Sequence, residues 1–243
     1  MLNESRGDIV FLLDVDNTLL DNDRFGADLG ARLEQSFGAE QRDRYWAIFA
    51  ALREEQSYAD YLAALQKFRV GLDGHPDLLQ MSSFLLEYPF ADRVYPNALE
   101  AIAYLGTLGL TVVLSDGDVV FQPRKIQRSG IWNAVAGRVL IDVHKERALD
   151  AMRQRYPARH YVMVDDKPLL LSAMKRVLED EVTTVFVHQG HYAAEYTARS
   201  GHPAIDAPPD MEIERIGDLL DHDLSDFPAM PPLRRTAANL ERT

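Results

Sequence analysis

The sequence predicts an α/β protein with a mostly parallel sheet core and an inserted all-helical cap domain. Three observations support this fold class. Short apolar, β-branched runs end in polar residues, helical patterns separate the later runs, and one long segment carries helical patterns only. Strands that alternate with helices predict a parallel sheet with helices on both faces.

The first expected strand is the apolar run Ile9-Val10-Phe11-Leu12-Leu13. Five consecutive apolar residues are typical of a strand that is buried on both faces. Asp14 and Asp16 follow directly, and their spacing lets both carboxylates start on one side of the chain. Ligands bind at this end of strands in open α/β sheets. Two close carboxylates there can hold a divalent cation, or divide nucleophile and acid roles.

Three later runs have the same character, and each gives way to polar residues or glycine. We expect strands at residues 110–114, 161–164 and 183–187, and helices at 96–108, 146–156 and from Pro168 to 178. The strands are followed by Ser115-Asp116-Gly117-Asp118, by Asp165-Asp166 and by His188-Gln189-Gly190. The sequence therefore places polar groups at the end of every expected strand.

The segment from about residue 22 to residue 91 contains no convincing strand pattern. Helical stretches are expected at residues 27–37, 41–55, 58–68 and 78–86, with Gly, Ser, His and Pro between them. We therefore divide the chain into a core, residues 1–21 and 92–243, and a helical cap, residues 22–91. In the tail we expect a helix at 216–220 and a loosely docked end from residue 228.

The composition excludes several classes of function. The formal net charge of −12 lacks the basic footprint of nucleic-acid binding, so we expect no nucleic-acid partner. The chain has no cysteine, which excludes disulfides, thiolate metal sites and a Cys nucleophile. The polar stretch before residue 9 and the short apolar run after it predict neither a signal peptide nor a membrane helix. We expect a soluble cytoplasmic protein with no membrane partner.

Four polar sites at strand ends or in loops occur in one order along the chain. They are Asp14-Val15-Asp16-Asn17-Thr18, Ser115, Lys145 and Val164-Asp165-Asp166. In this order and spacing the chain resembles the haloacid dehalogenase-like hydrolase superfamily, over roughly residues 8–22 and 92–190. The resemblance implies a Rossmann-like core, a cap between the first two motifs, and a phosphatase-type member.

The first motif suits the chemistry of phosphate-ester hydrolysis, which needs a nucleophile in line with the leaving oxygen and a proton donor. Asp14 can attack phosphorus and form an aspartyl-phosphate. Asp16 can protonate the leaving alcohol and then deprotonate water for the second step.

The second and third motifs suit the binding of a phosphoryl group. Ser115 can donate its hydroxyl to a phosphoryl oxygen, helped by the backbone N–H groups of Asp116 and Gly117. Lys145, before an expected helix, supplies positive charge to the nucleophile and the phosphoryl group. Lys125 and Arg147 are rival cations for this role.

Mg²⁺ is the expected cofactor, because this hard cation prefers oxygen ligands. Asp14 and an acid of the fourth motif would hold it, and the resemblance adds the backbone carbonyl of Asp16. Many members carry a Gly-Asp pair with a second acid four positions later, whereas this chain has Asp165-Asp166 followed by leucines. We expect Asp166 to bind the metal and give Asp165 a lesser role, direct or indirect. Lys167 is expected to form an ion pair rather than bind substrate.

Several further side chains favour structural roles over binding. A metal site of His188 and His191 is disfavoured, because Gly190 argues for a loop there. Arg24, Arg53 and Lys67 are expected on the solvated surface. The cap aromatics are expected in the core of the cap rather than against substrate; they are Tyr45, Trp46, Phe49, Tyr58, Tyr61 and Phe68.

The expected partner is a small phosphorylated metabolite, whose identity the sequence leaves open, as it does the oligomeric state. A 2-haloacid dehalogenase would use Asp14 on carbon and need neither Mg²⁺ nor Asp16, so the acids disfavour it. A phosphomutase would use the same residues and stays open. A phospho-accepting signalling domain has its acid pair first and its phosphorylated Asp later, the opposite order. A non-catalytic binding protein also stays open.

Overall fold

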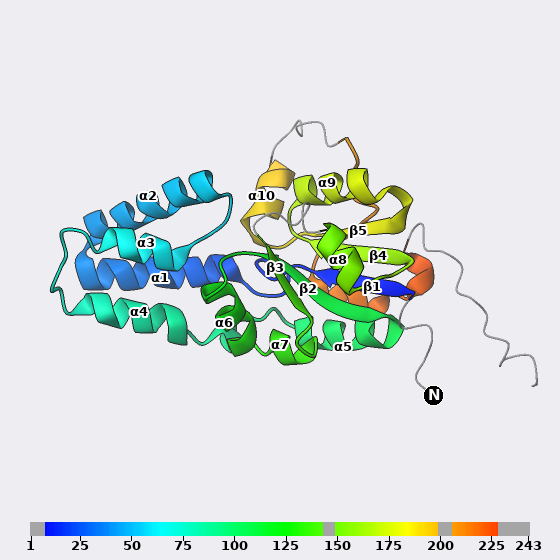
Figure 1. The fold of residues 1–243 in the computed structure, drawn as a ribbon, viewed down its shortest axis with the longest axis horizontal. Coiled ribbons are helices and arrows are strands. Elements are labelled where there is room, and N and C mark those ends of the chain that lie inside the picture. The colour runs from blue at the N-terminus through cyan, green and yellow to red at the C-terminus, as the bar shows by residue number, and fades with distance from the viewer. Residues whose placement is uncertain (1–7, 143–148, 199–205, 228–243) are drawn as a thin grey trace, which may run out of the picture.

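The core of the chain is a six-stranded parallel sheet with the order β3-β2-β1-β4-β5-β6 (Figure 1). The computed structural model describes residues 8–142, 149–198 and 206–227. Its strands are β1 Ile9–Leu13, β2 Leu110–Asp116, β3 Val139–Asp142, β4 His160–Asp165, β5 Val182–Val187 and β6 Met211–Ile213. This arrangement confirms the predicted fold class.

The register of the central strands brings their carboxyl ends to one edge of the sheet. Leu13, the last residue of β1, is level with Val113 on β2 and with Val164 on β4. The residues that follow on these strands therefore meet at the same edge, which is where parallel sheets bind ligands.

Helices cover both faces of the sheet. On one face, α5 Ala98–Leu108 and the 3₁₀ helix η4 Ile216–Asp221 pack against Ile9, Phe11 and Leu13. On the other face, α8 Leu149–Arg155 and α9 Pro168–Leu178 pack against Val10 and Leu12. Alternate residues of β1 thus enter two separate apolar cores, which is why the strand is an unbroken apolar run.

Four helices lie between β1 and the sheet's second strand and form a separate helical block in Figure 1 (blue to teal). They are α1 Asn22–Phe37, α2 Ala39–Gln56, α3 Tyr61–Phe68 and α4 Asp77–Glu87, and the 3₁₀ helix η2 Phe90–Arg93 leads back to the sheet. All four occur where helices were expected. Helix α1 begins five residues before its expected start at residue 27, because Asp21 accepts a hydrogen bond from the backbone N–H of Arg24 at 2.8 Å. The division into domains at residues 22 and 91 stays a prediction.

Within the described residues, two strands, β3 and β6, and three α-helices, α6 Phe121–Arg128, α7 Ile131–Ala134 and α10 Gly190–Ala198, were not expected from the sequence. Strands β3 and β6 have only four and three residues, too few for a clear pattern. The loop expected at residue 190 was wrong, because Gly190 begins α10. Its φ of +71° and its closeness to Asn17 explain the glycine: a Cβ there would lie 2.5 Å from the Cβ of Asn17. The helix expected at 216–220 is the 3₁₀ helix η4, and the expected docked end lies outside the described residues.

Candidate active site

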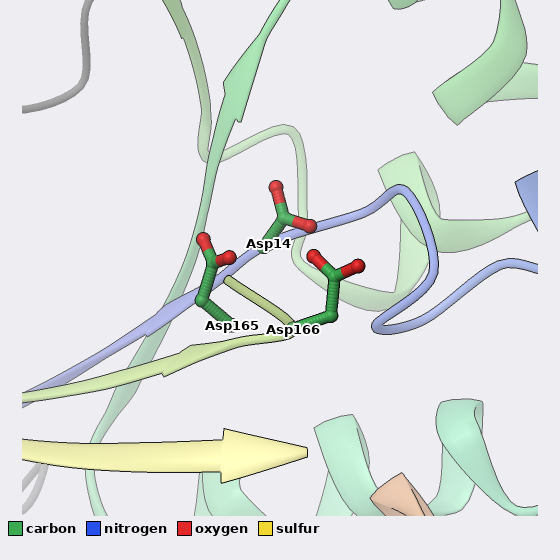
Figure 2. A group of neighbouring side chains, drawn as sticks. All are labelled: Asp14, Asp165 and Asp166. Carbon is green, nitrogen blue, oxygen red and sulfur yellow. The ribbon is translucent and has the colours of Figure 1, made fainter. Parts of the chain in front are cut away.

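Three carboxylates gather at the tips of β1 and β4 (Figure 2). Asp14, Asp165 and Asp166 are buried, and each offers an oxygen within 4.8 Å of those of the other two. Carboxylates this close repel one another strongly in a buried setting, so positive charge is needed among them. A donor set of three carboxylate oxygens fits a hard divalent cation such as Mg²⁺.

The register explains how β1 and β4 build this group. The backbone N–H of Asp14 donates to the carbonyl oxygen of Val164 at 3.0 Å, which extends the strand pairing past Leu13. The side chain of Asp165 is held by the backbone of its own loop, because one of its oxygens accepts the N–H of Lys167 at 2.9 Å. Both acids of the fourth motif lie in the group, but one oxygen of Asp165 is already occupied by this bond from Lys167.

The side chain of Asp16 lies outside this group and contacts helix α6 Phe121–Arg128 instead. Its Oδ1 accepts from Lys125 Nζ at 2.7 Å, and its Oδ2 accepts from Gln122 Nε2 at 3.2 Å. The carboxylate is 24% exposed and lines a cavity. Asp14 and Asp16 thus have different surroundings, as a division between two chemical roles requires.

Ser115 lies at the end of β2, is buried, and is also reached by Gln122. Its Oγ accepts from Gln122 Nε2 at 2.9 Å and donates to the carbonyl oxygen of Asp116 at 3.3 Å. The backbone N–H of Gly117 donates to the carbonyl oxygen of Asp142 at 3.3 Å. The side-chain amide nitrogen of Gln122 thus donates to both Ser115 and Asp16 and links these two residues.

The expected phosphate-binding Lys145 lies outside the described residues, as does Arg147. Lys125, which the sequence offered only as a rival cation, is fully buried beside Asp16. The contacts of Lys125 and Gln122 with Asp16 were not expected from the sequence. The signal was present, because both share one face of a helix with the apolar residues Phe121 and Ile126.

A cavity of about 290 Å³ opens beside Asp16, between the sheet edge and the helical block. Asp116 and Lys167 line it from the sheet side and form an ion pair of 3.3 Å, as expected for Lys167. The other lining residues belong mainly to α1, α2, the loop after α2 and α10; the aromatic ones are Trp46, Phe49, Tyr58, Tyr61 and Tyr192. Four of the six cap aromatics therefore line this cavity, and three of them, Trp46, Phe49 and Tyr61, also pack in the core of the block. Their expected role in the core rather than against substrate stays a prediction.

A family model of the haloacid dehalogenase-like hydrolases matches residues 10–177. The chain belongs to this family of hydrolases. The match confirms the predicted superfamily and the prediction of an enzyme. A search of curated protein sequences found no match.

Solved structures agree with this hydrolase family. A Burkholderia xenovorans protein assigned to the haloacid dehalogenase-like hydrolases is 58% identical, over 89% of this chain and 99% of that one, with a TM-score of 0.81. A haloacid dehalogenase-like hydrolase from Bacillus subtilis bound to magnesium is 13% identical (89% and 98% covered, TM-score 0.58). The L-2-haloacid dehalogenase of Xanthobacter autotrophicus is 19% identical (88% and 96% covered, TM-score 0.52). The last two likenesses show the fold alone.

Two of the phenols that line the cavity of this haloacid dehalogenase-like hydrolase have a raised pKa. Burial, with the negative charge of Asp16 next, raises the pKa of Tyr61 far above its ordinary value. Burial, followed by the charges of Asp60 and Asp118, raises the pKa of Tyr58. Neither hydroxyl is suited to act as a base or as an anionic nucleophile.

The two histidines weighed as a metal pair in the sequence have separate carboxylate partners. His188 Nε2 lies 2.8 Å from Glu212, whereas His191 Nδ1 lies 2.7 Å from Asp23. The backbone N–H of His191 also donates to Asp23 at 2.7 Å, which ties the start of α10 to the start of α1. Arg53 of α2 contacts the hydroxyl of Tyr192 on α10, so its side chain is part of the cavity wall rather than only of the solvated surface.

Within the described ranges, no helix is both long and apolar enough to cross a membrane. A cytoplasmic location stays a prediction from the composition.

Proposed function

We propose that this hydrolase cleaves a small phosphomonoester with the help of Mg²⁺, and that the phosphoryl group passes through Asp14. The group of three buried carboxylates at the tips of β1 and β4 carries this proposal. An anionic substrate beside such a group would be repelled unless a cation were bound there. A dehalogenase attacks carbon with a single carboxylate and has no need of this arrangement.

Asp14 and Asp166 would hold the metal, with Asp165 beside them and the backbone carbonyl of Asp16 as a further ligand. All three carboxylates offer the hard oxygen donors that Mg²⁺ prefers. When bound, Mg²⁺ would neutralise charge on the phosphoryl oxygens and on the carboxylates.

Asp14 is the proposed nucleophile. Its position at the tip of the central strand, tied by its N–H to Val164, supports in-line attack by a fixed carboxylate. The attack forms an aspartyl-phosphate and releases the alcohol, and water then hydrolyses the acyl phosphate bond to free Asp14 and inorganic phosphate.

Asp16 is the proposed acid and base. It gives a proton to the leaving oxygen in the first step and takes one from water in the second. Its place on the wall of the cavity, outside the group of three, supports a role toward the leaving group rather than as a side-chain ligand of the metal.

Ser115 is proposed to donate its hydroxyl to a phosphoryl oxygen, with the backbone N–H groups of Asp116 and Gly117 in support. For Gly117 this requires exchange of its present bond to Asp142. Lys145 is proposed to neutralise the phosphoryl charge, a role that falls outside the described residues.

The cavity supports a small substrate. Its volume of about 290 Å³ leaves room for a leaving group of modest size between Asp16 and the aromatic wall of α2. The helical block is proposed to act as a cap that limits water at the site. A phosphomutase would use the same residues and differ only in the fate of the phosphoryl group.

Release of phosphate from p-nitrophenyl phosphate tests the proposal. We expect activity that requires Mg²⁺, disappears with EDTA and disappears in Asp14→Asn. Chloride release from 2-haloacids is measured in parallel. Phosphatase activity that survives both EDTA and Asp14→Asn, or chloride release without phosphate release, would reject the proposed function.

A further inference from the structure

Helix α6 carries two polar side chains on its buried face. Gln122 is 3% exposed and Lys125 is 0% exposed, although the helix also has a solvent face for such residues. They are three residues apart, so they point to the same side of the helix. Because burying a charged amine is unfavourable unless it is paired, the position of Lys125 needs an explanation.

Both side chains contact the carboxylate of Asp16, one at each oxygen. Lys125 Nζ donates to Oδ1 at 2.7 Å and Gln122 Nε2 donates to Oδ2 at 3.2 Å. Two donors at the two oxygens fix the rotation of the carboxylate as well as its position. We call Gln122 and Lys125 the α6 clamp.

The α6 clamp is itself held from several directions. Asp118 accepts the backbone N–H groups of Val120 and Phe121 at 2.8 and 2.7 Å, which fixes the start of α6. A Cβ at Gly117 would lie 2.8 Å from the Cβ of Gln122, so the glycine after β2 lets the helix approach this closely.

The ammonium of Lys125 is enclosed by aromatic rings. It lies 5.5 to 5.9 Å from four ring centroids, and it also donates to Asn22 Oδ1 at 2.9 Å. The rings are those of Phe25, Tyr61, Phe90 and Phe121. Rings that exclude water strengthen both the cation–π contacts and the ion pair. The pair therefore has a rigid, dry setting on one side and the cavity on the other.

We propose that Gln122 and Lys125 are positioning residues that hold the Asp16 carboxylate aligned with the leaving group of the substrate. This inference rests on the phosphomonoesterase function proposed above. An ion pair that served stability alone would not need to face the cavity, as Asp16 does. Apolar residues of similar size often stabilise a core as well as a buried ion pair does. The same Gln122 amide also reaches Ser115 at 2.9 Å, so the clamp sets the acid and the phosphate-binding hydroxyl relative to each other.

Two substrates of nearly the same shape test the proposal: p-nitrophenyl phosphate and phenyl phosphate. Phenolate is the poorer leaving group and needs the proton from Asp16 more. For phenyl phosphate we expect Lys125→Met to lower kcat about 10- to 100-fold, at the low end of what acid catalysis contributes, because Asp16 is misaligned rather than absent. We expect KM to stay nearly unchanged and the loss with p-nitrophenyl phosphate to be smaller.

Three further variants separate positioning from a general structural effect. Lys175→Met is the matched control, because it breaks another partly buried pair, of 2.9 Å with Asp210, and should leave kcat unchanged. Gln122→Leu should show the same dependence on leaving group as Lys125→Met, and it decides the question if Lys125→Met does not fold. In an Asp16→Asn background, Lys125→Met should slow turnover no further.

The clamp is overturned if folded Lys125→Met or Gln122→Leu keeps wild-type kcat on phenyl phosphate. It is also overturned if kcat/KM, which reports on the steps up to release of the leaving group, falls by the same factor for both substrates, or if the effects of Lys125→Met and Asp16→Asn multiply. None of these results contradicts the proposed phosphatase function, provided that the wild-type protein hydrolyses the two esters. If the wild-type protein hydrolyses neither ester, the proposed phosphatase function is rejected. The positioning role of the α6 clamp, which rests on that function, is then rejected as well.

Discussion

The backbone N–H of Asp14 lies 3.0 Å from the carbonyl oxygen of Val164 and donates to it. This bond continues the parallel pairing of β1 and β4 beyond Leu13, the last residue of β1. It therefore places the proposed nucleophile beside the two acids that directly follow Val164. Two segments that are 150 residues apart in the chain (164 − 14) form one site because the central strands of the sheet have the same register.

The two acids of the fourth motif should contribute unequally to the binding of Mg²⁺. Asp166→Asn should weaken Mg²⁺ binding on the order of 10- to 100-fold, because a carboxylate charge is lost from the ligand set. Asp165→Asn should weaken it less, because one oxygen of Asp165 already accepts the N–H of Lys167. Calorimetric titration of each variant with MgCl₂ measures both effects.

Asp23→Asn is the matched control for this titration. Asp23 also lines the cavity, but it pairs with His191 and lies outside the group of three carboxylates. Its variant should bind Mg²⁺ as the wild-type protein does. Equal losses in the variants of Asp165 and Asp166, or a larger loss for Asp165, would show that the assignment within the pair is wrong.

Mg²⁺ should stabilise the folded protein. A ligand that binds only the folded state at about 100 times its Kd adds about 2.7 kcal/mol to the free energy of unfolding. Urea unfolding with and without MgCl₂ measures this gain, and Asp14→Asn should reduce it. The same gain in Asp14→Asn and in the wild-type protein would place the cation elsewhere.

Asp16→Asn should affect turnover much more than metal binding. Loss of a general acid and base lowers kcat by roughly 10²- to 10⁴-fold. The Mg²⁺ titration of this variant should stay close to wild type, because the carboxylate of Asp16 contacts Lys125 and Gln122 instead of the group of three. Lost Mg²⁺ binding together with high residual turnover would mean that the two roles are assigned wrongly.

Lys125→Met should destabilise the protein. Breaking a fully buried ion pair costs about 3–5 kcal/mol, and we expect about 1–3 kcal/mol here, because Asp16 is partly exposed and water can reach it. The measurement is the free energy of unfolding in urea. A variant as stable as the wild-type protein would indicate that the pair adds nothing to stability, without affecting the kinetic test of the clamp.

His160 should make stability depend on pH. Burial, followed by the charge of Lys175, lowers the pKa of His160 below its ordinary value of 6.5. The unfolded chain therefore takes up the proton first as the pH falls, so this contribution is complete above about pH 6.5 and is lost below it. The free energy of unfolding of His160→Gln should decrease less between pH 7 and pH 5 than that of the wild-type protein.

His222→Gln is the control for the pH series, because its ring is partly exposed and pairs with Asp226 at the surface. It should retain the wild-type decrease at low pH. A His160→Gln variant with the same decrease would show that His160 is not the group responsible.

The central strands could be predicted because burial on both faces gives them unbroken apolar sequences. β1 has the predicted bounds, and β2, β4 and β5 differ from prediction by no more than two residues at either end. β3 and β6 could not be predicted, because an edge strand of three or four residues is stabilised by its neighbour in the sheet rather than by a pattern of its own. Gly190 predicted a loop where α10 begins, since a glycine with positive φ can begin a helix as well as interrupt one.

The site was predictable where chemistry is concentrated in short motifs at strand ends. Asp14, Asp165 and Asp166 come together as the shared register requires. The pairing of Asp16 with Lys125 could not be predicted, because a contact across 109 residues depends on how α6 packs against η2 and α4. A lysine on the apolar face of a short helix is the pattern that, in retrospect, indicates such a contact.

Mass spectrometry of the peptide that contains Asp14 tests the central claim most directly. The peptide is recovered after rapid quenching of the protein during turnover of p-nitrophenyl phosphate with Mg²⁺. The account predicts a phosphoryl group on Asp14 that forms in the wild-type protein and is absent in Asp14→Asn. Steady release of phosphate with Asp14 unmodified, or a phosphoryl group on another residue, would contradict it.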